Sequence, residues 1–299
     1  MAVHVIQSGN RRLGLNESTT AIVNLEVSTW INNLTSIYSN SASLDTNFVY
    51  SHDIFVSDLK NAGIWDKMIA LNTFPYSSYN TAAAQHKTLM LTPLRPGIGS
   101  PGVWSWVSSG GTPNCNVTGY SPNGNFYIDC GLWFPYAFSN PNSHGASVYH
   151  YTGSTNGAFL LGAAPNYTYI FGIQNAISSG NYGINNIVLA SGWSSPSAPG
   201  GYGFFSFSRT GSTASTAYNG NSLGGFTQQS SSNSATVASS NCGANLTVFQ
   251  MQSALNALWY SPTSYISFVA FHQGLSKLET ENLYNAVQRL RQGLGGGYK

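Results

Sequence analysis

From about residue 87 to residue 272 the chain repeats one pattern, in which short apolar or alternating runs are separated by clusters of Gly, Pro, Asn and Ser. The clearest runs read NFYIDCGLWF, NYTYIFGIQNA, NNIVLASGW and GFFSFSRT. Short strands at regular spacing, with turn residues between them, are typical of a β-sandwich. Aromatic residues, which strands favour, make up 13% of the chain. We therefore predict a mainly β fold built as a sandwich.

The end of this region predicts a core strand followed by a helix. Residues 265–271 (YISFVAF) are apolar on both faces, as in a strand inside a packed β structure. Ser276 and Glu279 have the spacing of a capping box. A C-terminal amphipathic helix follows at about 277–292, and its apolar face would consist of Leu283, Val287, Leu290 and Leu294. We expect this helix to cover the sandwich as scaffold.

The N-terminal part has a different character, since six of the nine acidic residues lie between positions 17 and 66. Residues 1–40 read as extended, in AVHVIQ and then TTAIVNLEVSTWI. A helix capped by Asp45 or Thr46 and ended by Gly63 would follow. A second, shorter helix is predicted over IWDKMIALN, which places helices at about 46–72. The apolar face of the first helix would consist of Phe48, Phe55, Leu59 and Ala62.

Composition argues against several classes of partner. Charged residues make up 7% of the chain and the net charge is +2, with Lys and Arg scattered, so we expect no nucleic acid to bind. No apolar run approaches the ~18 residues that a membrane-spanning helix needs, so we expect no membrane contact. The start, MAVHVIQSGNRRLGL, lacks the apolar core of a secretory signal, so we expect synthesis and folding in a cytoplasm.

The cysteines leave one question open. Cys115 and Cys130 flank a segment that looks like a hairpin, while Cys242 lies far along the chain. The sequence does not decide whether the first two pair.

Catalytic and metal-binding patterns are absent from the sequence. Between Lys67 and Lys277 the one acidic residue is Asp129, whereas glycoside hydrolysis ordinarily uses two carboxylates. A calcium site also needs several oxygen ligands, usually including more than one carboxylate. The six histidines show no metal spacing, no G-x-S-x-G nucleophile motif occurs, and His272 is expected at the solvated end of its strand. We predict a protein that is not an enzyme and has no metal and no cofactor.

Aromatic residues that are flanked by polar residues in the sequence are the candidate binding residues. Flat rings beside Asn and Ser side chains suit carbohydrate, because apolar sugar faces stack on rings while hydroxyls form hydrogen bonds. In the alternative interpretation, Trp104 and Trp106 belong to the core and the loop aromatics are buried in a trimer contact. The candidates are Trp104, Trp106, Tyr120, Trp193 and Tyr202.

Three stretches together resemble a known group of proteins. The C-terminal segment SYISFVAFHQGLSKLETENLYNAVQRLRQGLG, the upstream FVSDLKNAGIWDKMIALNTFP with His86-Lys87 after it, and FFSFSRTGSTASTAYNG are the stretches concerned. They resemble bacteriophage and viral-metagenome proteins that carry a concanavalin A-like lectin/glucanase (laminin-G-like) domain. The resemblance covers about residues 45–295, and its two ends are the specific parts.

This resemblance implies a concanavalin A-like jelly roll over residues 41–299 in an exposed virion protein. It suggests a tail fibre or receptor-binding protein that recognises a host surface polysaccharide, as a trimer by analogy with phage fibres. Residues 1–40 would then attach the chain to other virion proteins or promote oligomerisation. Two alternatives remain, a capsid or tail decoration (cement) protein without glycan binding and a glycan depolymerase. The glucanase activity in the family name is not carried over, because the acidic residues for it are missing.

Overall fold

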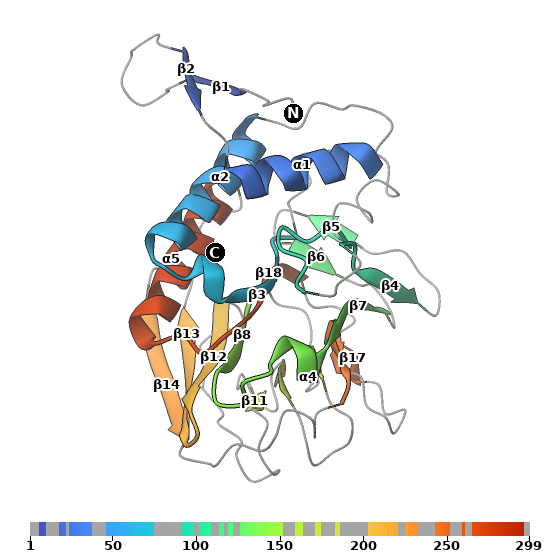
Figure 1. Cartoon of the computed structure of the whole chain (residues 1–299), viewed down its shortest axis with the longest axis vertical. Helices are drawn as coiled ribbons and strands as arrows, with labels where there is room; N and C mark the ends of the chain where they lie inside the picture. Colours follow the sequence, from blue (N-terminus) through green and yellow to red (C-terminus); the bar gives the residue numbers. More distant parts are fainter. Residues whose placement is uncertain are drawn as a thin grey trace.

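The computed structural model describes residues from most of the chain and arranges them as two stacked β-sheets with a layer of helices on one side (Figure 1). The described residues are 6–9, 18–21, 24–37, 46–74, 91–98, 102–108, 114–116, 119–121, 126–151, 159–163, 171–174, 183–185, 203–220, 225–232, 243–251, 259–260 and 265–295. The prediction of a mainly β sandwich with helices near the N-terminal side and a C-terminal helix is confirmed.

One sheet is six-stranded and antiparallel throughout, in the order β11-β10-β9-β15-β7-β4. Its strands are β4 (Ser105–Ser108), β7 (Phe126–Trp133), β9 (Phe159–Ala163), β10 (Phe171–Gln174), β11 (Gly183–Asn185) and β15 (Asn245–Val248).

The other sheet is eight-stranded, in the order β14-β13-β12-β8-β18-β6-β5, with β3 paired to β18. Its strands are β3 (Met68–Asn72), β5 (Asn114–Asn116), β6 (Gly119–Ser121), β8 (His144–Tyr151), β12 (Gly203–Gly211), β13 (Ala214–Gly220), β14 (Phe226–Ser232) and β18 (Tyr265–His272). Two separate antiparallel pairs are β1 (Ile6–Gly9) with β2 (Ser18–Ala21), and β16 (Gln250–Met251) with β17 (Trp259–Tyr260).

The inner core lies between the two sheets and follows from the period of two along a strand. On β7, Ile128, Cys130 and Leu132 point inward and are 0%, 0% and 2% exposed. They meet residues of the other sheet such as Ala146 and Val148 of β8. The intervening residues of β7 therefore point away from the core.

A second core lies between the outer face of the eight-stranded sheet and the helices α1 (Leu25–Ile37), α2 (Thr46–Asn61) and α5 (Lys277–Gly293). Tyr149, Phe204 and Phe268 supply the sheet side of this core. Its helical side includes Trp30, Phe55, Leu283 and Val287. Within the described residues, none of the helices is long and apolar enough to cross a membrane. Helices α1, α2 and α5 all cover the same face of the sandwich, the outer face of the eight-stranded sheet.

The C-terminal prediction is confirmed in detail. Ser276 Oγ accepts a hydrogen bond from the backbone of Glu279 at 3.3 Å, and Glu279 Oε2 accepts one from the backbone of Ser276 at 2.8 Å. Leu283, Val287 and Leu290 face the second core, and Leu294 packs against it partly buried.

Two secondary-structure predictions near the N-terminus are wrong. Residues 25–37, expected as extended, form α1, because Val27, Trp30 and Leu34 share a helical face buried against α2 and its neighbours. The second predicted helix is a short 3-10 turn, η1 (Trp65–Lys67), followed by strand β3. The apolar run of β3 pairs with β18, so tertiary pairing decided its structure. The predicted helical region of 46–72 therefore ends at Asn61 and the short η1 turn.

The hairpin expected between the two nearby cysteines is also wrong. Cys115 lies on β5 of the eight-stranded sheet, whereas Cys130 lies on β7 of the six-stranded sheet. The actual hairpin joins β5 to β6, and the chain then crosses to the other sheet. The thiol of Cys130 is buried, and this burial raises its pKa well above the ordinary value.

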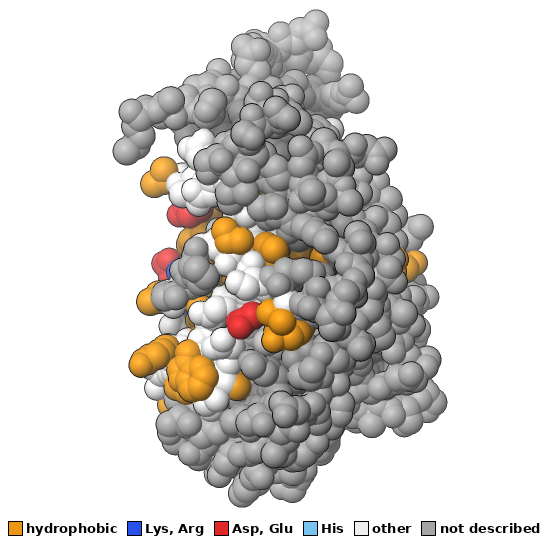
Figure 2. Space-filling view, turned by 90° about the vertical axis from the view of Figure 1, so that its right-hand side faces the viewer, with side chains coloured by type: hydrophobic (Ala, Val, Ile, Leu, Met, Phe, Trp, Pro, Cys, Tyr) orange, Lys and Arg blue, Asp and Glu red, His pale blue; other side chains and the backbone are white. Residues whose placement is uncertain are grey.

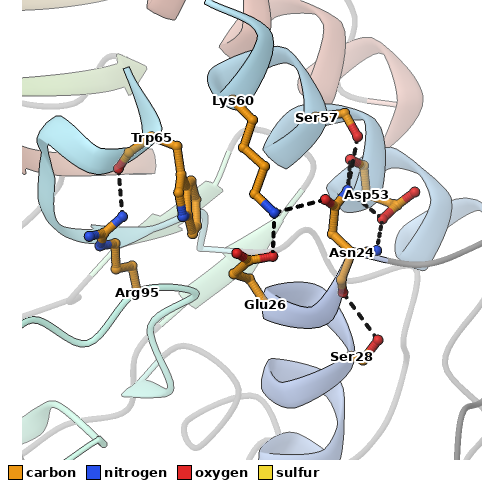
Figure 3. Close-up of polar contacts among 8 residues, drawn as sticks. All are labelled: Asn24, Glu26, Ser28, Asp53, Ser57, Lys60, Trp65 and Arg95. Carbon is orange, nitrogen blue, oxygen red and sulfur yellow. Dashed lines mark hydrogen bonds and ion pairs between the residues drawn. The ribbon is translucent and has the colours of Figure 1, made fainter. Parts of the chain in front are cut away.

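Polar contacts attach the start of α1 to α2 (Figure 3). The side chain of Asn24 donates to Asp53 Oδ1 at 2.8 Å and to Ser57 Oγ at 2.9 Å. Lys60 forms an ion pair with Glu26 at 2.6 Å. Helix α1 is therefore part of the folded domain and not of a separate extended segment.

Candidate functional site

The outer face of the six-stranded sheet lies on the opposite side of the sandwich from the helices. Strand β7 presents Tyr127, Asp129, Gly131 and Trp133 there, since these alternate with its inward residues. Figure 2, in which the right-hand side of Figure 1 faces the viewer, shows acidic side chains among hydrophobic groups and uncharged atoms. This face is the candidate functional site.

A bulge in β7 brings its outward side chains together. Asp129 is opposite Thr247, and Trp133 is opposite Asn245. Strand β7 therefore advances by four residues where its partner β15 advances by two, so β7 contains two extra residues. Gly131, at the centre, has a φ of 63°, which glycine adopts at little cost. The bulge therefore brings Asp129 and Trp133 closer together than four residues of a regular strand would place them.

The carboxylate of Asp129 is held from two sides. Its Oδ1 accepts a hydrogen bond from the backbone N–H of Gly131 at 2.8 Å, and its Oδ2 accepts one from Asn245 Nδ2 at 3.1 Å. Each carboxylate oxygen can accept two hydrogen bonds, so both oxygens retain the capacity to accept one from a ligand. On the other side of Asp129, the exposed Ser105 of β4 stands directly opposite in the register.

An exposed ring lies beside this fixed carboxylate. Trp133 is 43% exposed, whereas the other tryptophans whose side chains the structure describes, Trp30, Trp65 and Trp104, are at most 8% exposed. Tyr136 follows in the short helix α4 (Phe134–Ala137) and is 84% exposed. We call Asp129, Trp133 and Asn245 the β7 site.

The chemistry of the β7 site suits a polyhydroxylated ligand. A flat indole offers an apolar surface on which the C–H face of a sugar ring can stack. A carboxylate oxygen accepts hydrogen bonds from sugar hydroxyls, and an amide can both donate and accept. Because Asp129 and Asn245 already bond each other, they are oriented before a ligand arrives, which lowers the entropic cost of binding.

The structure places two of the sequence-predicted binding residues in the inner core. Trp104 is 0% and Tyr120 is 2% exposed, and both pack against Phe74, with ring centroids 6.4 Å and 6.1 Å away. Trp104 therefore belongs to the core, as the alternative interpretation of the sequence had it, and the expectation that Tyr120 lies in a solvent-facing loop is corrected. A ring enclosed between the sheets cannot stack on a ligand. The side chain of Trp106, and all of Trp193 and Tyr202, lie outside the described residues.

Sequence reasoning missed the β7 site although a signal was present. The run Tyr127-Ile-Asp-Cys-Gly-Leu-Trp133 alternates apolar inward residues with Tyr, Asp, Gly and Trp. That alternation is typical of a strand with one solvated face, and it places the one acid of the β region beside a Trp. The contribution of Asn245 had no local signal, because it arrives from 116 residues away.

A second polar group resembles catalytic machinery but is closed to solvent. Ser147 Oγ lies 2.8 Å from His272 Nε2 and 2.7 Å from Ser206 Oγ, while His272 Nδ1 lies 2.8 Å from the carbonyl oxygen of Gln273. Since that carbonyl only accepts, Nδ1 carries the proton and Nε2 accepts from Ser147. All three side chains are 0% exposed. The group therefore ties β8, β12 and β18 together and offers no entry to a substrate.

The burial of His272 also corrects its expected position at a solvated strand end. Burial lowers the pKa of His272 to about 4, against which the carbonyl of Gln273 acts in the opposite direction. Among the described residues, no group of three or more His, Cys, Asp or Glu side chains is placed to hold a metal ion.

Comparison with known proteins finds solved structures that align with part of this chain at low sequence identity. No protein-family model and no curated protein sequence matches the chain. Domain 4 of AbnA, an extracellular arabinanase from Geobacillus stearothermophilus solved with arabinotriose, aligns with 73% of this chain and 98% of its own at 16% identity and a TM-score of 0.46. A Ruminococcus gnavus IT-sialidase CBM40 bound to sialyllactose covers 50% of this chain and 88% of its own at 10% identity, with a TM-score of 0.39. The NanB sialidase of Streptococcus pneumoniae matches 54% of this chain over 26% of its own length, at 16% identity and a TM-score of 0.42.

Proposed function

We propose that this protein binds carbohydrate through the β7 site and does not cleave it. The observation that carries the proposal is the exposed Trp133 beside a carboxylate–amide pair, Asp129 and Asn245, joined at 3.1 Å across the bulge. The ring supplies the stacking surface, and the pair supplies hydrogen bonds whose geometry is already set.

The distribution of acidic residues supports binding without cleavage. Hydrolysis requires a second carboxylate about 5–10 Å from the first. The described acids other than Asp129 are Glu26, Asp53, Asp58, Asp66, Glu279 and Glu281, and all of them belong to the helices or to the η1 turn beside them. Two stacked sheets are about 10 Å apart and a helix layer adds about 10 Å more, so these acids lie roughly 20 Å from Asp129.

We further propose that the protein is an exposed component of a bacteriophage virion that recognises a host surface polysaccharide, as a tail fibre or other receptor-binding protein. The C-terminal motif and its resemblance to phage proteins support this role. Because α1 packs in the second core, the segment available for attachment to other virion proteins is shorter than residues 1–40. We propose that it precedes Asn24 and that the chain forms a trimer through this segment.

Glycan binding is tested with a polysaccharide and oligosaccharide array followed by calorimetry on the ligands that bind. We expect Trp133→Ala to abolish or weaken binding by at least about tenfold, since a stacked ring contributes on the order of 1–3 kcal/mol. The matched control is Tyr50→Ala on α2, because Tyr50 is 44% exposed and lies in the helical layer. Equal loss in both variants, or no loss in Trp133→Ala, would contradict the proposal.

The virion role is tested by location. Cryo-electron microscopy of the particle should show projecting copies with the six-stranded sheet directed outward. A chain lying flat between capsid or tail subunits, with Trp133 buried in contacts, would instead support the decoration role.

A further inference from the structure

We infer that the β7 site selects uncharged sugars and rejects anionic ones such as sialic acids and uronates. The inference rests on the proposed function and specifies the class of ligand that the same site takes. It follows from the negative charge of Asp129, beside which the strands of the six-stranded sheet place no Lys or Arg.

The sequence limits the charge that the strands and loops of the six-stranded sheet can carry. From Pro96 to Ser276 the only Asp, Glu, Lys or Arg residues are Asp129 and Arg209. Every strand of the six-stranded sheet and every loop that connects those strands falls within this range. Whichever of these segments approach the site, they bring no ammonium and no guanidinium group except that of Arg209.

Arg209 is not placed to serve the β7 site. It lies on β12 of the other sheet and is 0% exposed. Its Nη1 donates to the carbonyl oxygens of Gly211 and Ser212, at 3.4 Å and 3.1 Å, in the turn that follows its own strand. Among the strands of the six-stranded sheet and the loops that connect them, Asp129 is therefore the one charged group that a ligand on the outer face of this sheet can meet.

The carboxylate of Asp129 also cannot turn away from an anionic ligand without losing both of its hydrogen bonds. Gly131 N–H and Asn245 Nδ2 hold its two oxygens separately. The Debye length at physiological ionic strength is about 8 Å, so salt screens only in part the repulsion between this carboxylate and an anionic sugar stacked on the neighbouring Trp133. Sites that bind anionic groups ordinarily place an Arg or Lys side chain against them.

The test compares polysaccharides that share a sugar configuration and differ in charge. The probes are galactan with polygalacturonate, and mannan with polymannuronate, each measured against the wild-type protein and Asp129→Asn. We expect the wild type to bind at least one neutral member about fivefold or more tightly than its acidic partner. Asp129→Asn has nearly the same shape without the charge, so it should reduce this ratio to about twofold or less.

A second measurement on the wild type needs no variant. Raising NaCl from about 0.05 M to about 0.5 M should lower the ratio of the affinity for the neutral polysaccharide to the affinity for its acidic partner, because the Debye length shortens. Equal or tighter binding of an acidic member by the wild type, or a ratio that neither salt nor Asp129→Asn changes, overturns the inference and leaves carbohydrate binding standing. Binding of none of the four polymers, together with an empty glycan array, overturns the proposed function itself.

Discussion

The side-chain amide of Asn245 on β15 donates a hydrogen bond of 3.1 Å to the carboxylate of Asp129 on β7. This contact joins residues 116 positions apart and crosses the strand bulge at Gly131. It fixes a charged acceptor beside an exposed ring, which is the arrangement on which the proposed function depends.

Removing the amide should weaken ligand binding more than it weakens the fold. We expect Asn245→Ala to lower affinity for a neutral glycan by about fivefold to tenfold, because the carboxylate loses one of its two supports. The free energy of unfolding should fall by about 1 kcal/mol or less, since this bond is only partly buried. Calorimetry and urea unfolding measure the two quantities. Asn61→Ala, at an exposed position of α2, serves as control, and an unchanged affinity in Asn245→Ala would count against the site.

Truncation of two tryptophans of the β region should lower the free energy of unfolding by clearly different amounts. Trp104→Ala removes a fully buried ring between the sheets and should cost about 3–5 kcal/mol of unfolding free energy. Trp133→Ala removes a ring that is 43% exposed and should cost about 1 kcal/mol or less. Denaturant unfolding of both variants checks the difference. Similar losses would show that Trp133 is a core residue.

The C-terminal helix should stabilise the sandwich through one face only. Leu283 is 0% exposed, so Leu283→Ala should cost about 2–5 kcal/mol. Leu278, in the first turn of the same helix, is 67% exposed, so Leu278→Ala should change stability by about 0.5 kcal/mol or less. The pair is compared by thermal and urea unfolding. No loss in Leu283→Ala would mean that α5 does not pack as described.

Acidification should destabilise the protein through two buried histidines. Burial lowers the pKa of both His52 and His272 from 6.5 to about 4 in the folded state. Between these values the unfolded chain binds protons that the folded chain does not, so stability falls as the pH drops from about 6.5 to about 4. Each histidine should contribute a loss of about 3 kcal/mol across that window.

The matched measurement is urea unfolding at several pH values for the wild type, His52→Gln and His272→Gln. Each variant should lose stability at neutral pH but show a shallower dependence on pH, because one titrating group is gone. A wild-type stability that stays constant from pH 6.5 to pH 4 would contradict the buried, neutral state of these rings.

The parts of the fold that local chemistry determines could be predicted. The strand at 265–271 and the capping box of Ser276 and Glu279 depend on residues a few positions apart, and both are present as expected. The sandwich itself followed from strand alternation and turn residues. By contrast, α1 was misjudged because TTAIVNLEVSTWI contains β-branched residues, while its helical face is stabilised by burial against α2.

The site depended on contacts between distant parts of the chain. The alternation along β7 was visible, but the bulge at Gly131 is defined only by pairing with β15. Aromatic residues in polar surroundings were a poor guide, because the inward side of β4 and the strand β6 bury Trp104 and Tyr120 against Phe74. Burial, and not the neighbouring residues in the sequence, distinguishes the exposed Trp133 from the core residue Trp104.

The most direct test follows the indole N–H signals of the seven tryptophans by NMR while a glycan identified on the array is added. Trp133→Phe assigns the Trp133 signal, and Trp104→Phe assigns that of the buried ring. We predict that the Trp133 signal shifts with saturating ligand while the Trp104 signal stays in place. A Trp133 signal that does not move, while another tryptophan reports binding, would contradict the assignment of the β7 site.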